Sequence, residues 1–148
     1  MRRSSMIAPV AVASLALIGC GGEPKLVPVT GLVRLDGKPV DGVRVYFWPL
    51  EQSAKMSVNQ LAIGFSDKEG KFSLRGTNGD GIAAGEYKVT FARPMTRAGR
   101  GVERQGAKPG EVGAAETLSK EQTDQSLTKH RATVSESSHD FVFDLPSK

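Results

Sequence analysis

Apolar and polar residues alternate along most of the chain from residue 26 onward. In the first such run, Val29, Gly31, Val33 and Leu35 share one face of an extended segment, and the polar Thr30 and Arg34 lie on the other. A period of two places alternate side chains on opposite faces of a β-strand, so each run predicts a strand with one buried face. The further runs are carried by Val43, Val45 and Phe47; Leu61, Ile63 and Phe65; Phe72 and Leu74; Tyr87, Val89 and Phe91; Thr133 and Val134; and Phe141, Phe143 and Leu145.

Turn-forming residues separate these runs. Asp36-Gly37-Lys38-Pro39, Ser66-Asp67-Lys68-Glu69-Gly70 and Asn78-Gly79-Asp80-Gly81 all combine aspartate or asparagine with glycine, which favours tight turns. The segment from Ala114 to Gln125 lacks the apolar stripe of an amphipathic helix. Seven short strands with such spacing predict an all-β fold, a seven-stranded antiparallel β-sandwich.

The first twenty residues follow a different pattern. Arg2 and Arg3 precede an apolar run that ends in Leu17-Ile18-Gly19-Cys20. The run is shorter than the roughly 20 apolar residues that span a bilayer, and its layout is typical of an export signal. Its last four residues form a lipobox, the cleavage and lipidation signal of a bacterial lipoprotein. A plain secretory signal is the alternative, but it would leave Cys20 as an unpaired thiol in an exported protein.

We therefore expect a lipidated protein of the bacterial cell envelope. Residues 1–19 would be the signal peptide, 20–26 the diacylglyceryl-carrying Cys20 with a flexible tether, and 27–148 the β domain. A single acyl chain gives marginal membrane binding, whereas two or three chains anchor a protein firmly. No aspartate follows Cys20, which favours the outer membrane or another periplasm-facing location.

Four stretches of the β domain resemble a known family. The segment from Val29 to Val43 is similar to the opening of carboxypeptidase-regulatory-like domains. The segment from Phe65 to Phe72 is similar to their T-D-x-x-G-x-F hairpin, and Gly85-Glu86-Tyr87-Lys88-Val89 to their G-x-Y-x-V strand. The segment from Phe141 to Leu145 resembles their closing strand. The resemblance implies a transthyretin-like, immunoglobulin-like sandwich, which is common on bacterial lipoproteins. It concerns the accessory sandwich, not the zinc-dependent catalytic domain, so it implies no peptidase activity.

One part of the chain departs from the family pattern. The family brings a leucine and a valine together in its penultimate strand, whereas here Leu127 and Val134 are widely separated. The glycine turn that follows is replaced by Ser135-Glu136-Ser137-Ser138. The sequence therefore leaves the pairing of the sixth strand open.

Composition narrows the possible functions. The chain has 148 residues, 39% hydrophobic and 24% charged, as expected of one globular domain. The formal net charge of +4 includes Arg2 and Arg3, which would leave with the signal, so binding to nucleic acid gains no support. A single cysteine excludes a disulfide within the chain. The core must therefore supply the stability.

No arrangement of residues with metal-binding or catalytic spacing stands out. His130, His139 and Asp140 lie near the ends of the last two strands, but two solvent-facing histidines explain them without a metal ion. Asp67 and Glu69 lack the further acids of a calcium loop and fit a β-turn. The chain contains no H-E-x-x-H or G-x-S-x-G motif. We expect no catalytic residue, no metal site and no cofactor.

Two features are candidates for binding a partner. A long charged insertion at 93–126 has a basic first half, with Arg93, Arg97, Arg100 and Arg104, and an acidic second half. The basic half would contact anionic lipid, lipopolysaccharide or an acidic partner, or else the insertion is a mobile, solvated loop. Trp48, with Tyr46 and Leu32, lies on outward faces and forms an aromatic patch unless loops cover it.

These observations predict a role rather than a reaction. We expect a lipid-anchored, non-enzymatic cell-envelope β-sandwich module with a structural or interaction role. The alternative is a module whose loops bind a peptide, a glycan or a metal ion. Its partners would be the membrane, through diacylglyceryl-cysteine, and an envelope protein or glycan.

Overall fold

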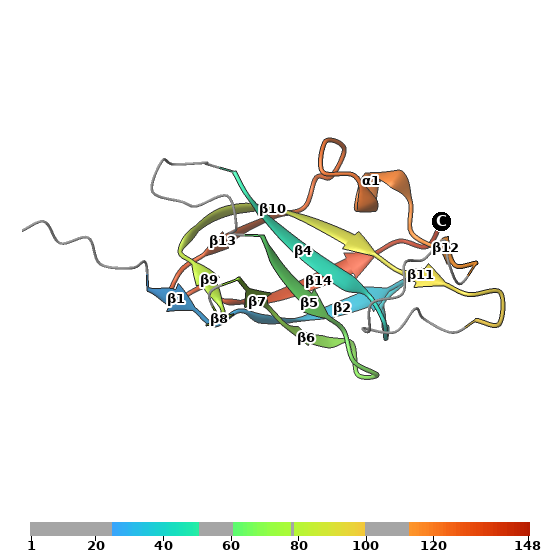
Figure 1. Ribbon diagram of the computed structural model, residues 1–148, viewed down its shortest axis with the longest axis horizontal. Helices are drawn as coiled ribbons and strands as arrows, with labels where there is room; N and C mark the ends of the chain where they lie inside the picture. The colour runs from blue at the N-terminus through green and yellow to red at the C-terminus, as the bar shows by residue number, and fades with distance from the viewer. Residues whose placement is uncertain (1–24, 51–60, 78, 100–112) are drawn as a thin grey trace, which may run out of the picture.

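The computed structural model describes residues 25–50, 61–77, 79–99 and 113–148. Two β-sheets pack face to face in this part of the chain, with the first strand at one end and the C-terminus toward the other (Figure 1). The predicted all-β sandwich is confirmed. Within these ranges, no helix has the length and apolarity needed to cross a membrane. Cys20, the predicted signal segment and residues 51–60 lie outside the described residues.

The larger sheet has six strands. Its order is β13 (Arg131–Val134), β10 (Gly85–Ala92), β4 (Arg44–Pro49), β5 (Ala62–Phe65), β7 (Arg75–Gly76) and β8 (Gly79–Asp80). All neighbours in it are antiparallel. The sixth predicted strand, β13, pairs with β10, which settles the pairing that the sequence left open.

The second sheet centres on β2 (Thr30–Leu35). This strand pairs with β14 (Asp140–Leu145) on one side, and with β3 (Lys38–Pro39) and β6 (Lys71–Ser73) on the other. The β2–β14 pair is parallel, so the prediction of a wholly antiparallel sandwich was wrong at this point. No short turn joins these two strands, and local sequence therefore does not set their relative direction.

Shorter elements complete the fold. Each of the seven predicted runs contains a strand, but several two-residue strands lie outside them. The additional pairs are β1 (Leu26–Val27) with β9 (Ile82–Ala83), and β11 (Pro94–Met95) with β12 (Ala115–Glu116). One short helix, α1 (Lys120–Thr123), lies in the insertion, where the sequence showed no helical stripe.

Aromatic side chains form the centre of the core. Phe143 packs against the rings of Phe47, Phe91 and Phe72, with centroids 6.2, 5.1 and 6.2 Å away. Phe47 and Phe91 come from the larger sheet, and Phe72 and Phe143 from the smaller one. Edge-to-face and offset contacts of this kind add to the burial of apolar area. These rings therefore hold the two sheets together.

The inward face of β5 differs from the prediction. Ala62 and Gly64 are buried, whereas Leu61, Ile63 and Phe65 are only partly buried. Ala62 lies opposite Phe47 in the register of β4 and β5. A small residue beside a large ring leaves room for the side chains of the facing sheet. Close packing therefore favours Ala62 and Gly64, rather than the larger residues, on the inward face of β5.

The second half of the insertion closes the core. Leu118 is 3% exposed and belongs to the core cluster, and Gln122 is also 3% exposed. The Gln122 side-chain amide donates to the carbonyl of Pro146, and its oxygen accepts from the Ser119 amide, which caps α1. Because β13 pairs with only the first half of β10, α1 covers the remainder near that edge (Figure 1). For residues 113–126, the hypothesis of a solvated loop was wrong.

Two turns show how particular side chains and backbone conformations support the fold. Asp36 and Gly37 have φ of 50° and 76°, the left-handed conformations of a tight hairpin between Leu35 and Lys38. This confirms the predicted Asp-Gly turn. Farther along, the buried Ser66 hydroxyl accepts from the Val43 amide at 2.9 Å and donates to the Val40 carbonyl at 2.7 Å. Ser66 therefore satisfies two backbone groups that would otherwise be buried without partners.

Candidate functional site

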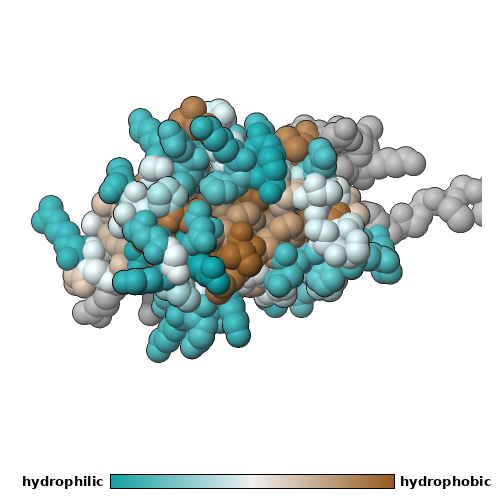
Figure 2. Space-filling model, turned by 180° about the vertical axis from the view of Figure 1, so that it is seen from behind, coloured by the Kyte–Doolittle hydropathy of each residue, from teal (hydrophilic) through white to brown (hydrophobic). Residues whose placement is uncertain are grey.

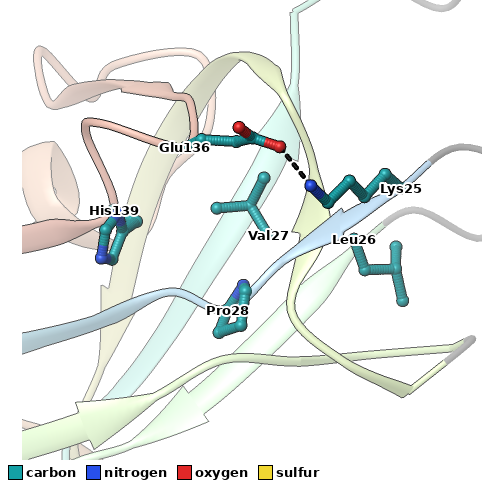
Figure 3. Close-up of a pocket in the computed structure, with 6 residues that line it drawn as sticks. All are labelled: Lys25, Leu26, Val27, Pro28, Glu136 and His139. Atoms are coloured by element: carbon teal, nitrogen blue, oxygen red, sulfur yellow. Dashed lines mark hydrogen bonds and ion pairs between the residues drawn. The ribbon is translucent and has the colours of Figure 1, made fainter.

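An open hollow of about 220 Å³ lies at the end of the sandwich where the described chain begins. Its lining consists of Lys25, Leu26, Val27, Pro28, Glu136 and His139 (Figure 3). β1 supplies one side, and the turn between β13 and β14 supplies the other. The hollow therefore lies between the described residues nearest Cys20 in sequence and the connection from β13 to β14.

The ion pair between Lys25 and Glu136 in this hollow is weak. The Lys25 ammonium contacts the Glu136 carboxylate, but the two side chains are 81% and 71% exposed. Exposed pairs of this kind contribute about 0–1 kcal/mol because water and salt screen them. Among the described residues, no group of three or more histidine, cysteine, aspartate or glutamate side chains is arranged to hold a metal ion.

The two histidines lie in different environments. His139 is exposed and lines the hollow, as expected for a strand-end residue. His130 is only partly exposed, because its ring packs edge-on against Phe91 and Phe143 with centroids 5.2 and 6.0 Å away. Burial lowers the pKa of His130 below its ordinary value. The prediction of a solvent-facing His130 was therefore wrong, since the aromatic core extends to this side chain.

The predicted basic surface is only partly described. Arg93 is used within the fold: its amide donates to the Glu116 carboxylate, and its guanidinium to the Asp41 carbonyl at 3.2 Å. Arg97 is exposed in the turn after β11. Arg100 and Arg104 lie outside the described residues. Their role as partner-binding residues remains a prediction.

The outward aromatic face contains a stacked pair. The rings of Tyr46 and Trp48 lie 6.1 Å apart with an interplanar angle of 24°. The Trp48 indole donates to the Thr90 hydroxyl at 2.8 Å, and Thr90 is buried beneath this contact. Both rings and Leu32 are partly exposed. Leu32 lies on the other sheet, so the three residues do not form one patch.

The acidic turn residues have structural partners. Asp67 accepts from the amides of Glu69 and Lys71 at 3.0 and 2.8 Å, as in an Asx turn. Asp80 forms an exposed ion pair with Arg75. The turn interpretation is confirmed for Asp67, whereas Asp80 lies in the short strand β8 and not in a turn.

Shifted pKa values also have structural causes. The amide of Ser147 donates to Asp36 and lowers the pKa of that carboxyl. The hydroxyl of Ser126, and then its amide, lower the pKa of Asp124 in the same way. Burial raises the pKa of Tyr87, whose hydroxyl donates to the Ala83 carbonyl at 2.7 Å.

Sequence reasoning missed one surface feature. β14 forms an edge of the smaller sheet, and Val142 on it is 59% exposed between Asp140 and Asp144. The sequence Asp-Phe-Val-Phe-Asp shows the alternation of a strand with an acidic outer face. It does not show that, among the described residues, no strand pairs with one side of β14.

Comparison with known proteins adds little to the fold. No protein-family model matches the chain, and no curated protein matches it. Among solved structures, the major pilin subunit of Bacillus cereus is similar, with 12% identity and a TM-score of 0.43. The alignment covers 84% of this chain and 30% of the pilin chain. A similarity of this size does not extend to function.

Proposed function

We propose that the chain is a lipid-anchored, non-enzymatic β-sandwich module of the bacterial cell envelope, with a structural or interaction role. The lipobox Leu17-Ile18-Gly19-Cys20 carries this proposal. The family resemblance of the β domain supports it, since carboxypeptidase-regulatory-like sandwiches of the transthyretin type are common on such lipoproteins. The proposed location is a periplasm-facing membrane surface, preferentially that of the outer membrane.

The position of the first strand determines how such an anchor would hold the domain. β1 begins at Leu26, six residues after Cys20. A fully extended chain spans at most about 3.5 Å per residue, so the lipidated cysteine would lie within roughly 20 Å of β1. The end of the sandwich with β1 and the hollow would therefore be close to the membrane. The C-terminal end would point away from it (Figure 1).

The non-enzymatic role is supported by the use of the reactive side chains. His130 packs among phenylalanines, and Ser66 bonds two backbone groups in a buried turn. The only cysteine in the sequence is the proposed lipid attachment site. These residues have structural tasks, whereas a hydrolase requires a nucleophile, a base and an oxyanion site at one place.

Membrane fractionation tests the anchor. Wild type and Cys20→Ala would be expressed in a Gram-negative host, labelled with a palmitate analogue and separated by centrifugation. We expect label and membrane association in the wild type and the loss of both in Cys20→Ala. Equal membrane association of the two proteins would show that the lipoprotein proposal is wrong.

A second candidate function is the binding of a short peptide or sugar at the hollow. The observation in its favour is the apolar lining from Leu26 and Pro28 beside the polar His139 (Figure 3). Thermal unfolding with calcium, zinc, peptide and glycan fragments tests it. A saturable rise in Tm that Pro28→Glu abolishes would support binding there, and a constant Tm would contradict it.

A further inference from the structure

The outer edge of β14 presents backbone hydrogen-bonding groups that pair with no strand among the described residues. The amides of Thr30 and Asp36 donate to the carbonyls of His139 and Leu145, which fixes the alternation of the parallel β2–β14 ladder. The odd-numbered residues of β14 therefore bond to β2, and the peptide groups of residues 140, 142 and 144 point the other way. Within the described part of the chain, no strand pairs with this side of β14.

The side chains along this edge alternate between acidic and apolar. Val142 is 59% exposed, the most exposed large apolar residue among those described, and it lies beside Leu32 in the register. Asp140 and Asp144 flank it on the same outward face. Figure 2 shows apolar residues surrounded by hydrophilic ones on the side of the molecule opposite that of Figure 1. The edge thus combines backbone donors and acceptors, an apolar contact and two carboxylates.

We propose that β14 accepts an extended basic segment of a partner protein as an additional β-strand. Strand addition of this type obtains affinity from main-chain hydrogen bonds and specificity from alternate side chains. The best complement to this edge has a β-branched residue opposite Val142 and a lysine or arginine opposite each aspartate. Opposite charges facing each other across strands stabilise the pairing, and like charges destabilise it.

The same charges disfavour a second copy of this chain as the occupant. An antiparallel pair of β14 strands centred on Val142 would place Asp140 of each copy opposite Asp144 of the other. Two such contacts repel, which is a common means by which edge strands avoid self-association. The acidic residues therefore select a basic partner strand and also protect the free protein from pairing with itself.

The nearby contacts leave the two carboxylates available. Asp140 accepts a hydrogen bond from the Thr30 hydroxyl at 3.0 Å, which uses one of its oxygens. Asp144 lies 3.9 Å from the Arg34 guanidinium, at the limit of an ion pair, and is 58% exposed. A carboxylate offers about four acceptor positions, so both retain capacity for a partner's cation.

Peptide binding to the full chain in detergent micelles tests the proposal. The probe is the peptide acetyl-Thr-Lys-Thr-Val-Thr-Lys-Thr-amide, measured by calorimetry at low and high salt. We expect saturable binding that weakens with salt, because the charge pairs are exposed. Peptides of the same length with glutamate in place of lysine, or with N-methyl groups on alternate amides, should not bind.

Three variants locate the site. Val142→Pro removes one edge amide and should weaken binding about tenfold, whereas Val142→Thr keeps the amide and should retain binding. Asp140→Asn with Asp144→Asn should weaken it by about tenfold through the loss of two cross-strand charge pairs. The control Glu69→Gln with Glu121→Gln changes the net charge equally at other exposed sites and should have no effect.

The outcomes separate this inference from the anchor. Circular dichroism would first establish that each variant is folded. No saturable binding, equal binding of the acidic peptide, or unchanged binding by Val142→Pro would overturn the proposal. Dimerisation of the wild type that Val142→Pro abolishes would overturn it in favour of a second copy. The inference rests on the interaction role proposed above and deepens it. Peptide binding measured in micelles does not depend on Cys20. The fractionation experiment and the peptide-binding experiment can therefore fail independently.

Discussion

Replacing Gly31 by alanine should strongly destabilise the fold. Gly31 lies in the middle of β2, and its φ is not positive, so alanine adds no left-handed backbone strain. An added Cβ would lie 2.6 and 2.7 Å from two carbons of the Phe72 ring and would overlap the Phe141 carbonyl oxygen. Phe72 is 4% exposed and stacks on Phe143, so its ring has no free space into which to move.

The magnitude follows from these contacts. Overpacking of a core costs about 1–3 kcal/mol, and a contact with a ladder carbonyl should place Gly31→Ala near the upper end. At about 3 °C of Tm per kcal/mol for a domain of this size, we expect a fall in Tm of about 10 °C. Urea unfolding followed by the fluorescence of Trp48, the only tryptophan, measures the free energy directly.

Two further variants isolate the cause. Gly37→Ala introduces a side chain into open space at φ of 76°, so its cost should be the left-handed strain alone, about 1–2 kcal/mol. Phe72→Leu shortens the clashing ring and should destabilise Gly31→Ala less than it destabilises the wild type. The reasoning is refuted if Gly31→Ala unfolds within about 0.5 kcal/mol of the wild type, the range of neutral surface changes.

Three other predictions concern buried polar groups. Burial lowers the pKa of His130, so the folded state favours the neutral ring. The contribution of this neutral ring to the free energy of unfolding is complete above the unfolded-state pKa of about 6.5 and is lost as pH falls below it. The urea midpoint should therefore fall between pH 7.5 and 5, less so in His130→Gln, and a matching effect of His139→Gln would contradict this explanation. Ser66→Ala leaves two buried backbone groups without partners and should cost about 1–3 kcal/mol; an unchanged urea midpoint would show that water replaces the hydroxyl. Gln122→Ala should cost a similar amount and increase proteolysis of the insertion, whereas Glu121→Ala, on the exposed side of α1, should change neither.

Several features were predictable because short segments determine them. The alternation around Val43 to Phe47 and Tyr87 to Phe91 located strands whose inward residues are fully buried. The Asp36-Gly37 turn was predictable because these two residue types tolerate positive φ. The predicted membrane address is also local, since four consecutive residues carry it.

Other features depended on partners distant in the chain. In the strand from residue 61 to 65, the residues on both faces are apolar or small. The alternation therefore predicted the strand but not which of its faces points inward. The register with β4 decided this by placing Ala62 opposite Phe47. The burial of His130 had no local signal either, because it required two phenylalanines from different sheets.

The sequence by itself determined where strands and turns form and where an anchor is expected, because dihedral preference and alternation act over a few residues. Only the tertiary structure decided that β2 and β14 run parallel, that α1 closes the core beside Leu118, and that no strand among the described residues pairs with the outer side of β14. These outcomes depend on which segments distant in the chain meet in the folded protein. The packing of whole sheets decides that, and no short segment encodes it.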